Sequence, residues 1–264
     1  MSDFTATGDI GRIPFASFAA FIAAYTLFNW PGWRLFCILF GLVAIAFAFY
    51  QYMHFHEEKP VSAEFMKKRT HKGVLPSFSL LKNRSSRLAI LACMLDALCN
   101  GRIFTFFPIL LISKGIETTH IVYFTFMYTF GSLAGKVILG RLADHIKPAF
   151  MFMICELLMA AALWLLVLTD QPLILFCLAA LLGTVSRGTV PVAQVLVADT
   201  VEQEHYGDII SIRDFGVGII SIITPALYGY LASRFGLNVI YHLMACGALL
   251  ASIPIILSIR SSTP

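Results

Sequence analysis

Long apolar runs separated by short polar turns make up most of the sequence. Each run is about 18–26 residues long, and about 20 residues of α-helix cross the hydrocarbon of a bilayer. Polar and apolar residues do not alternate within the runs, which are about twice as long as the strands of a membrane barrel. We therefore expect an all-α, polytopic membrane helix bundle with eight transmembrane helices. The predicted spans are Ile13–Trp30, Leu35–Met53, Leu88–Ser113, His120–Leu139, Ala149–Thr169, Pro172–Val197, Ile209–Ala232 and Leu237–Ile259.

A helical hairpin is predicted most clearly at residues 131–148. Gly131 and Gly135 have Gly-x-x-x-Gly spacing in one apolar run, and a charged turn that contains Arg141 and Asp144 follows it. The next apolar run begins directly after this turn. A loop this short between two spans requires antiparallel helices, with the charges of the turn in water at the membrane surface.

Composition strengthens the membrane assignment. Hydrophobic residues make up 58% of the chain and charged residues 13%, and the mean hydropathy is +0.81. Soluble domains carry about 25% charged residues, so a water-exposed globule is excluded. The net charge of +4 is small and is concentrated in one loop. We therefore expect the lipid bilayer as the partner, and no nucleic acid.

Residues 54–87 form the one long break between the apolar runs and contain eight Lys and Arg residues. If this linker is cytoplasmic, the alternation of the spans places 12 Lys and Arg residues on its side and three on the other. Positive charges next to membrane spans favour the cytoplasmic side. We therefore expect a multi-pass protein of the plasma (inner) membrane with both termini in the cytoplasm.

No pattern typical of a catalytic centre, a metal site or a cofactor site is found in the sequence. The six cysteines lie inside apolar runs, without a Cys-x-x-Cys pair or a histidine at ligand spacing. No Gly-x-x-x-x-Gly-Lys-Ser/Thr loop is present, so direct coupling to ATP is not expected. An integral-membrane enzyme, the rival class, would need a cluster of His, Asp or Glu at one membrane face. We expect no enzyme, no metal and no cofactor.

Two motifs resemble the major facilitator superfamily of secondary transporters. Gly140-x-x-x-Asp144 is similar to the Gly and Asp of the cytoplasmic hairpin motif of that superfamily. Pro225-x-x-x-Gly229 is similar to its glycine- and proline-rich eleventh helix. The resemblance implies a plan of twelve helices, in which two six-helix halves are joined by a cytoplasmic linker.

This plan divides the chain into three parts. Residues 1–53 correspond to the last two helices of the N-terminal half, residues 54–87 to the linker, and residues 88–260 to the six-helix C-terminal bundle. The first four helices of the plan are expected to be lacking. The resemblance implies transport of a small solute by alternating access, driven by an ion gradient. The alternative is a truncated, non-transporting membrane remnant or an assembly partner of such a transporter.

Charged and polar residues inside the spans are the candidate site. A charge at the centre of a span costs about 2.5–3.5 kcal/mol, which favours a functional role. Arg102 and Arg187, with Asn100 and Gln194, are predicted to bind an organic or phosphorylated anion. The alternative is that each arginine pairs with an internal acid and only joins helices. A regular helix does not direct Asp96 and Arg102 to one side, so we expect a break near Asn100.

Two acidic residues in the spans have different predicted roles. Asp96 is the candidate for coupling to H⁺ or Na⁺, and a structural partnership with Asn100 is the alternative. Glu156 lies within a predicted span, where helix packing or an ion pair with Lys136 is expected.

The hairpin motif is expected to act as a gate. By the resemblance, Gly140, Arg141 and Asp144 form the cytoplasmic gate motif. Asp144 is predicted to lie within hydrogen-bond or ion-pair range of residues 8–12, where the positive end of a helix dipole would face it. The alternative is an ordinary solvated turn.

Overall fold

The computed structural model of the 264-residue chain describes residues 26–27, 30–55, 78–100, 102–143 and 145–261. The chain divides into two compact units, one of residues Ile10–Leu75 and one that contains Pro76–Pro264.

In the unit of residues Ile10–Leu75, the described residues form a short strand pair and one helix. Strand β1 (Thr26–Leu27) pairs antiparallel with β2 (Trp30–Pro31), and α2 (Gly32–Phe55) follows directly. The end of the first predicted span is therefore extended where we expected helix. A residue before proline is disfavoured in the helical region, which accounts for Trp30. The remainder of that predicted span lies outside the described residues.

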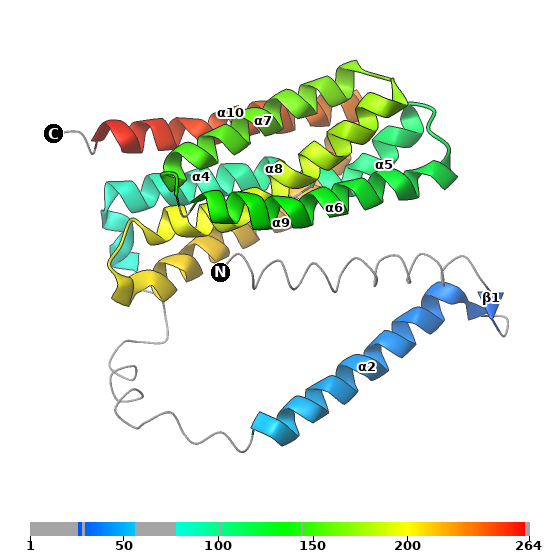
Figure 1. Cartoon of the computed structure of the whole chain (residues 1–264), viewed down its shortest axis with the longest axis horizontal. Helices are drawn as coiled ribbons and strands as arrows, with labels where there is room; N and C mark the ends of the chain where they lie inside the picture. The colour runs from blue at the N-terminus through cyan, green and yellow to red at the C-terminus, as the bar shows by residue number, and fades with distance from the viewer. Residues whose placement is uncertain (1–25, 28–29, 56–77, 101, 144, 262–264) are drawn as a thin grey trace. The chain divides into compact units, whose positions relative to one another are not determined.

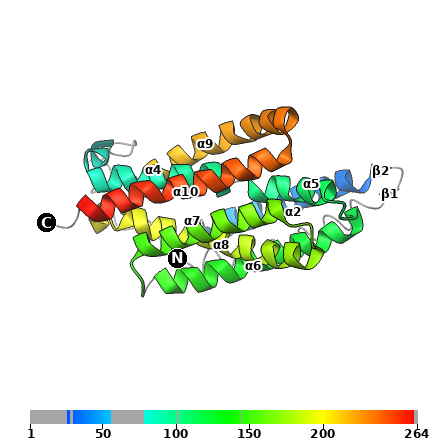
Figure 2. The same cartoon turned by 90° about the horizontal axis from the view of Figure 1, so that it is seen from above.

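The larger unit is a bundle of helices that run alongside one another (Figures 1 and 2). Short 3₁₀ turns precede the helices that begin at Arg84 (η1, Phe78–Lys82) and at Tyr206 (η2, Gln203–His205). The helices are α4 (Arg84–Asn100), α5 (Ile103–Ser113), α6 (Thr118–Ala143), α7 (Pro148–Leu168), α8 (Pro172–Ala198), α9 (Tyr206–Phe235) and α10 (Leu237–Ser261).

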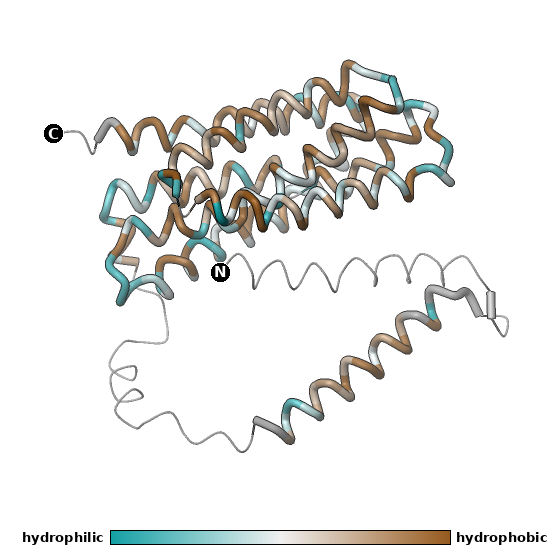
Figure 3. The backbone as a smooth tube through the Cα atoms, viewed as in Figure 1, coloured by the Kyte–Doolittle hydropathy of each residue, from teal (hydrophilic) through white to brown (hydrophobic). Residues whose placement is uncertain are grey.

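Six helices in the described part of the chain are long and apolar enough to cross a membrane, with α4 and α5 counted as one span. Figure 3 shows apolar residues along their lengths and hydrophilic residues at the turns between them. These six agree with the last six predicted spans to within a few residues at most ends. A shorter apolar stretch, Cys37–Met53, lies within α2. The predicted total of eight is therefore not confirmed.

The closest helix packing in the bundle joins α6 to α8 through glycines. A Cβ atom added to Gly131 would lie 2.1 Å from the carbonyl oxygen of Ala180, and one added to Gly135 would lie 2.1 Å from that of Thr184. Gly183 makes the reciprocal approach, since its Cβ would lie 2.0 Å from the carbonyl oxygen of Tyr128. Small residues permit this backbone contact in membrane helices, where packing rather than water exclusion joins the helices.

The turns alternate between the two ends of the bundle, as the hairpin pattern predicts. At one end, Lys114 of the α5–α6 turn contacts Asp170 of the α7–α8 turn, with 2.7 Å between Nζ and Oδ1. At the other end, Ser85 at the start of α4, Lys147 before α7 and Asp199 after α8 line one pocket. The end that carries Lys147 is the one to which sequence analysis assigned most of the basic residues.

One tyrosine joins α9 to the last turn of α4. The hydroxyl of Tyr228 donates a hydrogen bond to the carbonyl oxygen of Leu98 at 2.9 Å, and its side chain is 1% exposed. We expect Tyr228→Phe to lower the free energy of unfolding by about 1 kcal/mol, because only the hydrogen bond is lost. Tyr228→Ala should cost about 3–5 kcal/mol, because it also leaves a cavity. Thermal unfolding in detergent measures both values, and equal losses in the two variants would contradict the assignment.

Candidate functional site

The site begins at a break in the first span of the larger unit. Helix α4 ends at Asn100 and α5 begins at Ile103, with Arg102 as its N-cap residue. The expected interruption near Asn100 is therefore present. Such a break exposes backbone groups that a continuous helix would pair within itself, and transporters use discontinuous helices of this kind to bind solutes and ions.

Asp96 and Asn100 form the centre of a buried polar cluster. The side-chain amide nitrogen of Asn100 donates to Asp96 Oδ1 at 3.1 Å and also to the carbonyl oxygen of Ser186 on α8. Ser186 Oγ lies 2.7 Å from the hydroxyl oxygen of Tyr128 on α6. The cluster therefore links α4, α6 and α8, and Asp96 has the structural partner that sequence analysis named as an alternative to ion coupling.

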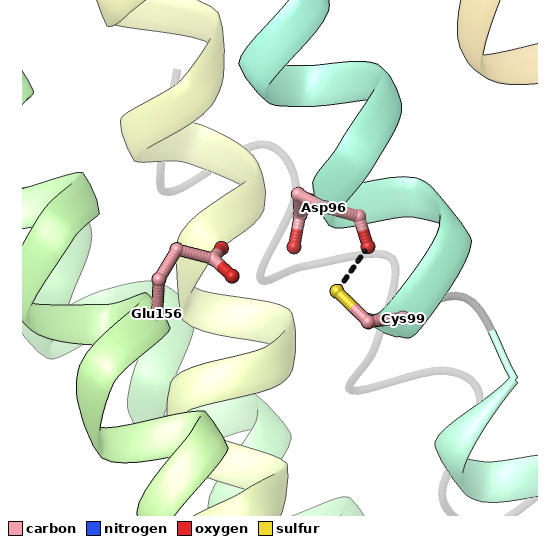
Figure 4. A group of neighbouring side chains, drawn as sticks. All are labelled: Asp96, Cys99 and Glu156. Carbon is pink, nitrogen blue, oxygen red and sulfur yellow. Dashed lines mark hydrogen bonds between the residues drawn. The ribbon is translucent and has the colours of Figure 1, made fainter. Parts of the chain in front are cut away.

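Glu156 brings a second acid to this cluster from α7. Its side chain is 0% exposed and points toward Asp96 (Figure 4). Carboxylate oxygens of Asp96 and Glu156 and the sulfur of Cys99 all lie within 4.8 Å of one another. No nitrogen or hydroxyl group in the described part of the chain donates a hydrogen bond to Glu156, and the group in hydrogen-bond range of it is the carboxyl group of Asp96. The expected ion pair with Lys136 is therefore wrong, and the acid faces another acid instead.

The two candidate anion-binding arginines have different surroundings. A terminal nitrogen of Arg102 (Nη2) donates to the carbonyl oxygen of Ser221 on α9, whereas its Nε is buried without a hydrogen-bond partner among the described residues. Arg187 is half-buried on α8 and makes no hydrogen bond or ion pair with any described residue. Its charge acts across space on Asp96. Neither arginine is in salt-bridge contact with an acid among the described residues, so the pairing that we gave as the alternative is not found within them.

Within the described residues, no hydrogen bond or ion pair joins Gln194 or the gate motif to the polar cluster. Gln194 is half-buried further along α8 than Arg187. In the gate motif, Gly140 is buried in α6 and Arg141 is exposed in the last turn of that helix. Asp144 and its predicted partners at residues 8–12 lie outside the described residues, so the gate contact stays a prediction.

Sequence analysis left two charged residues out of the candidate site. Arg213 on α9 is 7% exposed and donates to Asp214 Oδ1 at 2.8 Å, and its charge acts on Asp96. Glu156 was assigned to packing or an ion pair. The signal that could have marked it is its position, since a carboxyl group surrounded by apolar residues of a span needs a partner in the protein.

Most of the helical bundle matches one known protein family. Residues 115–264 match a family model described as Major Facilitator Superfamily, and this part contains α6 to α10. The match covers more than half of the chain. No curated protein matches the chain.

Proposed function

Because this chain belongs to the major facilitator superfamily, whose members transport small solutes across membranes, we propose that it carries a small organic or phosphorylated anion by alternating access. The family and the six apolar helices support a multi-pass membrane protein that acts in transport rather than catalysis. The substrate class, the driving ion and the residues below are proposals.

The observation that carries the anion proposal is the state of Arg187. A guanidinium group half-buried in the middle of a span is costly unless it is paired, and in the described part of the chain it has no contact partner. A carboxylate or phosphate on the solute would supply that partner through two parallel hydrogen bonds. Arg102 is proposed to add a second positive charge from the break between α4 and α5, and Gln194, seven residues from Arg187 on α8, a further amide donor. Asn100 contributes indirectly, because its amide nitrogen already donates to Asp96 and to the carbonyl oxygen of Ser186.

Coupling to an ion gradient is assigned to Asp96. This carboxyl group is 6% exposed, is bonded to Asn100 beside the helix break, and lies within range of the charge of Arg187. A cation bound at Asp96 and an anion bound at Arg187 would each alter the electrostatic environment of the other. Both termini and the linker of residues 54–87 are proposed to be cytoplasmic, in the plasma (inner) membrane, from the distribution of basic residues.

Counterflow in proteoliposomes tests the proposal. Vesicles that contain the chain are preloaded with inorganic phosphate, a dicarboxylate or a hexose phosphate, and uptake of the same labelled anion is measured. We expect Arg187→Ala to reduce uptake by at least about tenfold, since a charged hydrogen bond contributes about 1.5–3 kcal/mol. Arg187→Lys should recover only part of it, because an ammonium group does not form the bidentate pair.

Arg234→Ala is the matched control. Arg234 is exposed in the last turn of α9 and lies over the ring of Tyr230, away from the polar cluster. Its replacement should leave counterflow unchanged within about twofold, because an exposed charge of this kind contributes little. Unchanged uptake in Arg187→Ala, or no uptake of any of these anions by folded protein, would overturn the anion proposal.

A further inference from the structure

We infer that Asp96, Glu156 and Asn100 form an intramembrane binding site for one sodium ion. The inference deepens the proposed function and rests on it for one consequence, namely that sodium drives transport. The site itself is a feature of the folded bundle and is tested without any transport assay.

The three side chains meet in a part of the bundle that water does not reach. Asp96 is 6% exposed, Glu156 0% and Asn100 5%. Asp96 and Asn100 come from the last turns of α4, whereas Glu156 reaches the same place from α7 (Figure 4). Oxygen atoms of the two acids lie within 4.8 Å of each other.

Several oxygen atoms of this group have no nitrogen or hydroxyl donor among the described residues. No nitrogen or hydroxyl group among the described residues donates a hydrogen bond to the carboxylate oxygens of Glu156 or to the side-chain oxygen of Asn100. The only group in hydrogen-bond range of Glu156 among these residues is the other acid, Asp96. The amide nitrogen of the same Asn100 donates to Asp96 Oδ1, which holds this amide beside the acids. Nearly all buried polar atoms in folded proteins have partners, so orphaned acceptors this close together indicate a ligand that accepts their lone pairs.

The electrostatics of the site also favour a cation. Helix α4 ends at Asn100, so the negative end of its dipole lies at the site. The positive charges of Arg213 and Arg187 interact electrostatically with Asp96. Neither arginine forms an ion pair with either acid among the described residues. The other titratable groups that interact electrostatically with the two acids are the thiols of cysteines 93, 99 and 155. Broken transporter helices bind cations in this arrangement.

The donor atoms select the kind of cation. Carboxylate and amide oxygens are hard ligands, which excludes soft metals as the preferred occupants. Cys99 is not a ligand in this arrangement, because its thiol donates to the carbonyl oxygens of Leu95 at 3.3 Å and Asp96 at 3.0 Å.

Ligand number then separates the hard cations. Oxygens lie about 2.3–2.6 Å from Ca²⁺, and Na⁺ has nearly the same radius. The oxygen atoms of the two acids lie within 4.8 Å of each other, so one ion of this size can contact both acids. Calcium takes 6–8 oxygens, usually with water, whereas this buried site offers few. We therefore assign sodium, and potassium is compared with it in the test below.

Thermal unfolding of the purified chain in detergent tests the site. Unfolding is followed by the reaction of a fluorogenic maleimide with the buried thiols, at constant ionic strength maintained with choline chloride. We expect saturating NaCl to raise the midpoint by about 5–10 °C, because the ion binds only the folded chain. KCl should leave the midpoint unchanged. The absence of a sodium-specific shift in the wild type would overturn the inference.

Matched variants assign the shift to the named residues. Glu156→Gln and Asp96→Asn should abolish the sodium shift, whereas Cys99→Ala should retain it. If either acid variant fails to fold, the binding of radioactive sodium to the wild-type chain is measured instead. We expect one bound ion per chain, and the absence of binding would overturn the inference. A midpoint that rises at low pH and no longer responds to sodium would show a proton-binding site and also overturn the inference. A sodium shift without anion counterflow would contradict only the proposed function.

Discussion

Gly135→Ala is expected to lower the free energy of unfolding by about 3 kcal/mol, the upper part of the usual range for overpacking. The added methyl group would lie 2.1 Å from the carbonyl oxygen of Thr184, a distance at which no rotamer change relieves the contact. Helices α6 and α8 must therefore separate along their shared face. At about 2–4 °C per kcal/mol, the unfolding midpoint in detergent should fall by about 6–12 °C.

Gly218→Ala is the control for this substitution. Gly218 also lies within a span, on α9, but a Cβ atom there would meet nothing within 4 Å. Alanine is the better helix former, so this variant should gain up to about 1 kcal/mol. The two Gly→Ala changes therefore have opposite signs. An equal midpoint for both variants would show that contact between the backbones of α6 and α8 does not hold the bundle together.

Lys114→Met is expected to cost about 2 kcal/mol, because it removes three hydrogen bonds from one buried ammonium group. The Nζ atom donates to the carbonyl oxygens of Val167 at 3.0 Å and Thr169 at 2.9 Å, and to Asp170 Oδ1 at 2.7 Å. Val167 and Thr169 lie at the C-terminal end of α7, where a positive charge also favours the helix dipole. Thermal unfolding in detergent measures the loss.

Asp170→Asn separates the carbonyl contacts from the ion pair. The side chain of Asp170 is 79% exposed, whereas that of Lys114 is 8% exposed. An exposed partner contributes little to an ion pair, so this substitution should change stability by less than about 0.5 kcal/mol. A loss in Asp170→Asn as large as that in Lys114→Met would assign the stabilisation to the ion pair and contradict the role of Lys114 as a cap on α7.

The sequence predicted the spans of the bundle well because each span is a local property. A run of about 20 apolar residues bounded by charges is recognisable without knowledge of its neighbours. The last six predicted spans therefore agree with the structure to within a few residues at most ends, and the break near Asn100 followed from helical periodicity. The prediction of helix at Trp30 was wrong, since the following proline overrides the apolar composition there.

The partners of the site residues depended on helices that are far apart in the chain. Gly131 and Gly135 were visible as a spaced pair, but only the bundle shows that α8 is the helix that they approach. The packing of α7 and α4 brings Glu156 to Asp96, where the sequence had suggested Lys136.

The sequence by itself therefore determined that the chain forms apolar helices that cross a membrane, and which charged residues lie within them. The tertiary structure alone decided that two acids meet each other, that Arg102 bonds to the backbone of α9, and that Arg187 has no contact partner among the described residues. The physical reason is that hydropathy and helical periodicity act over one span, whereas the direction of a buried charge depends on how several spans pack.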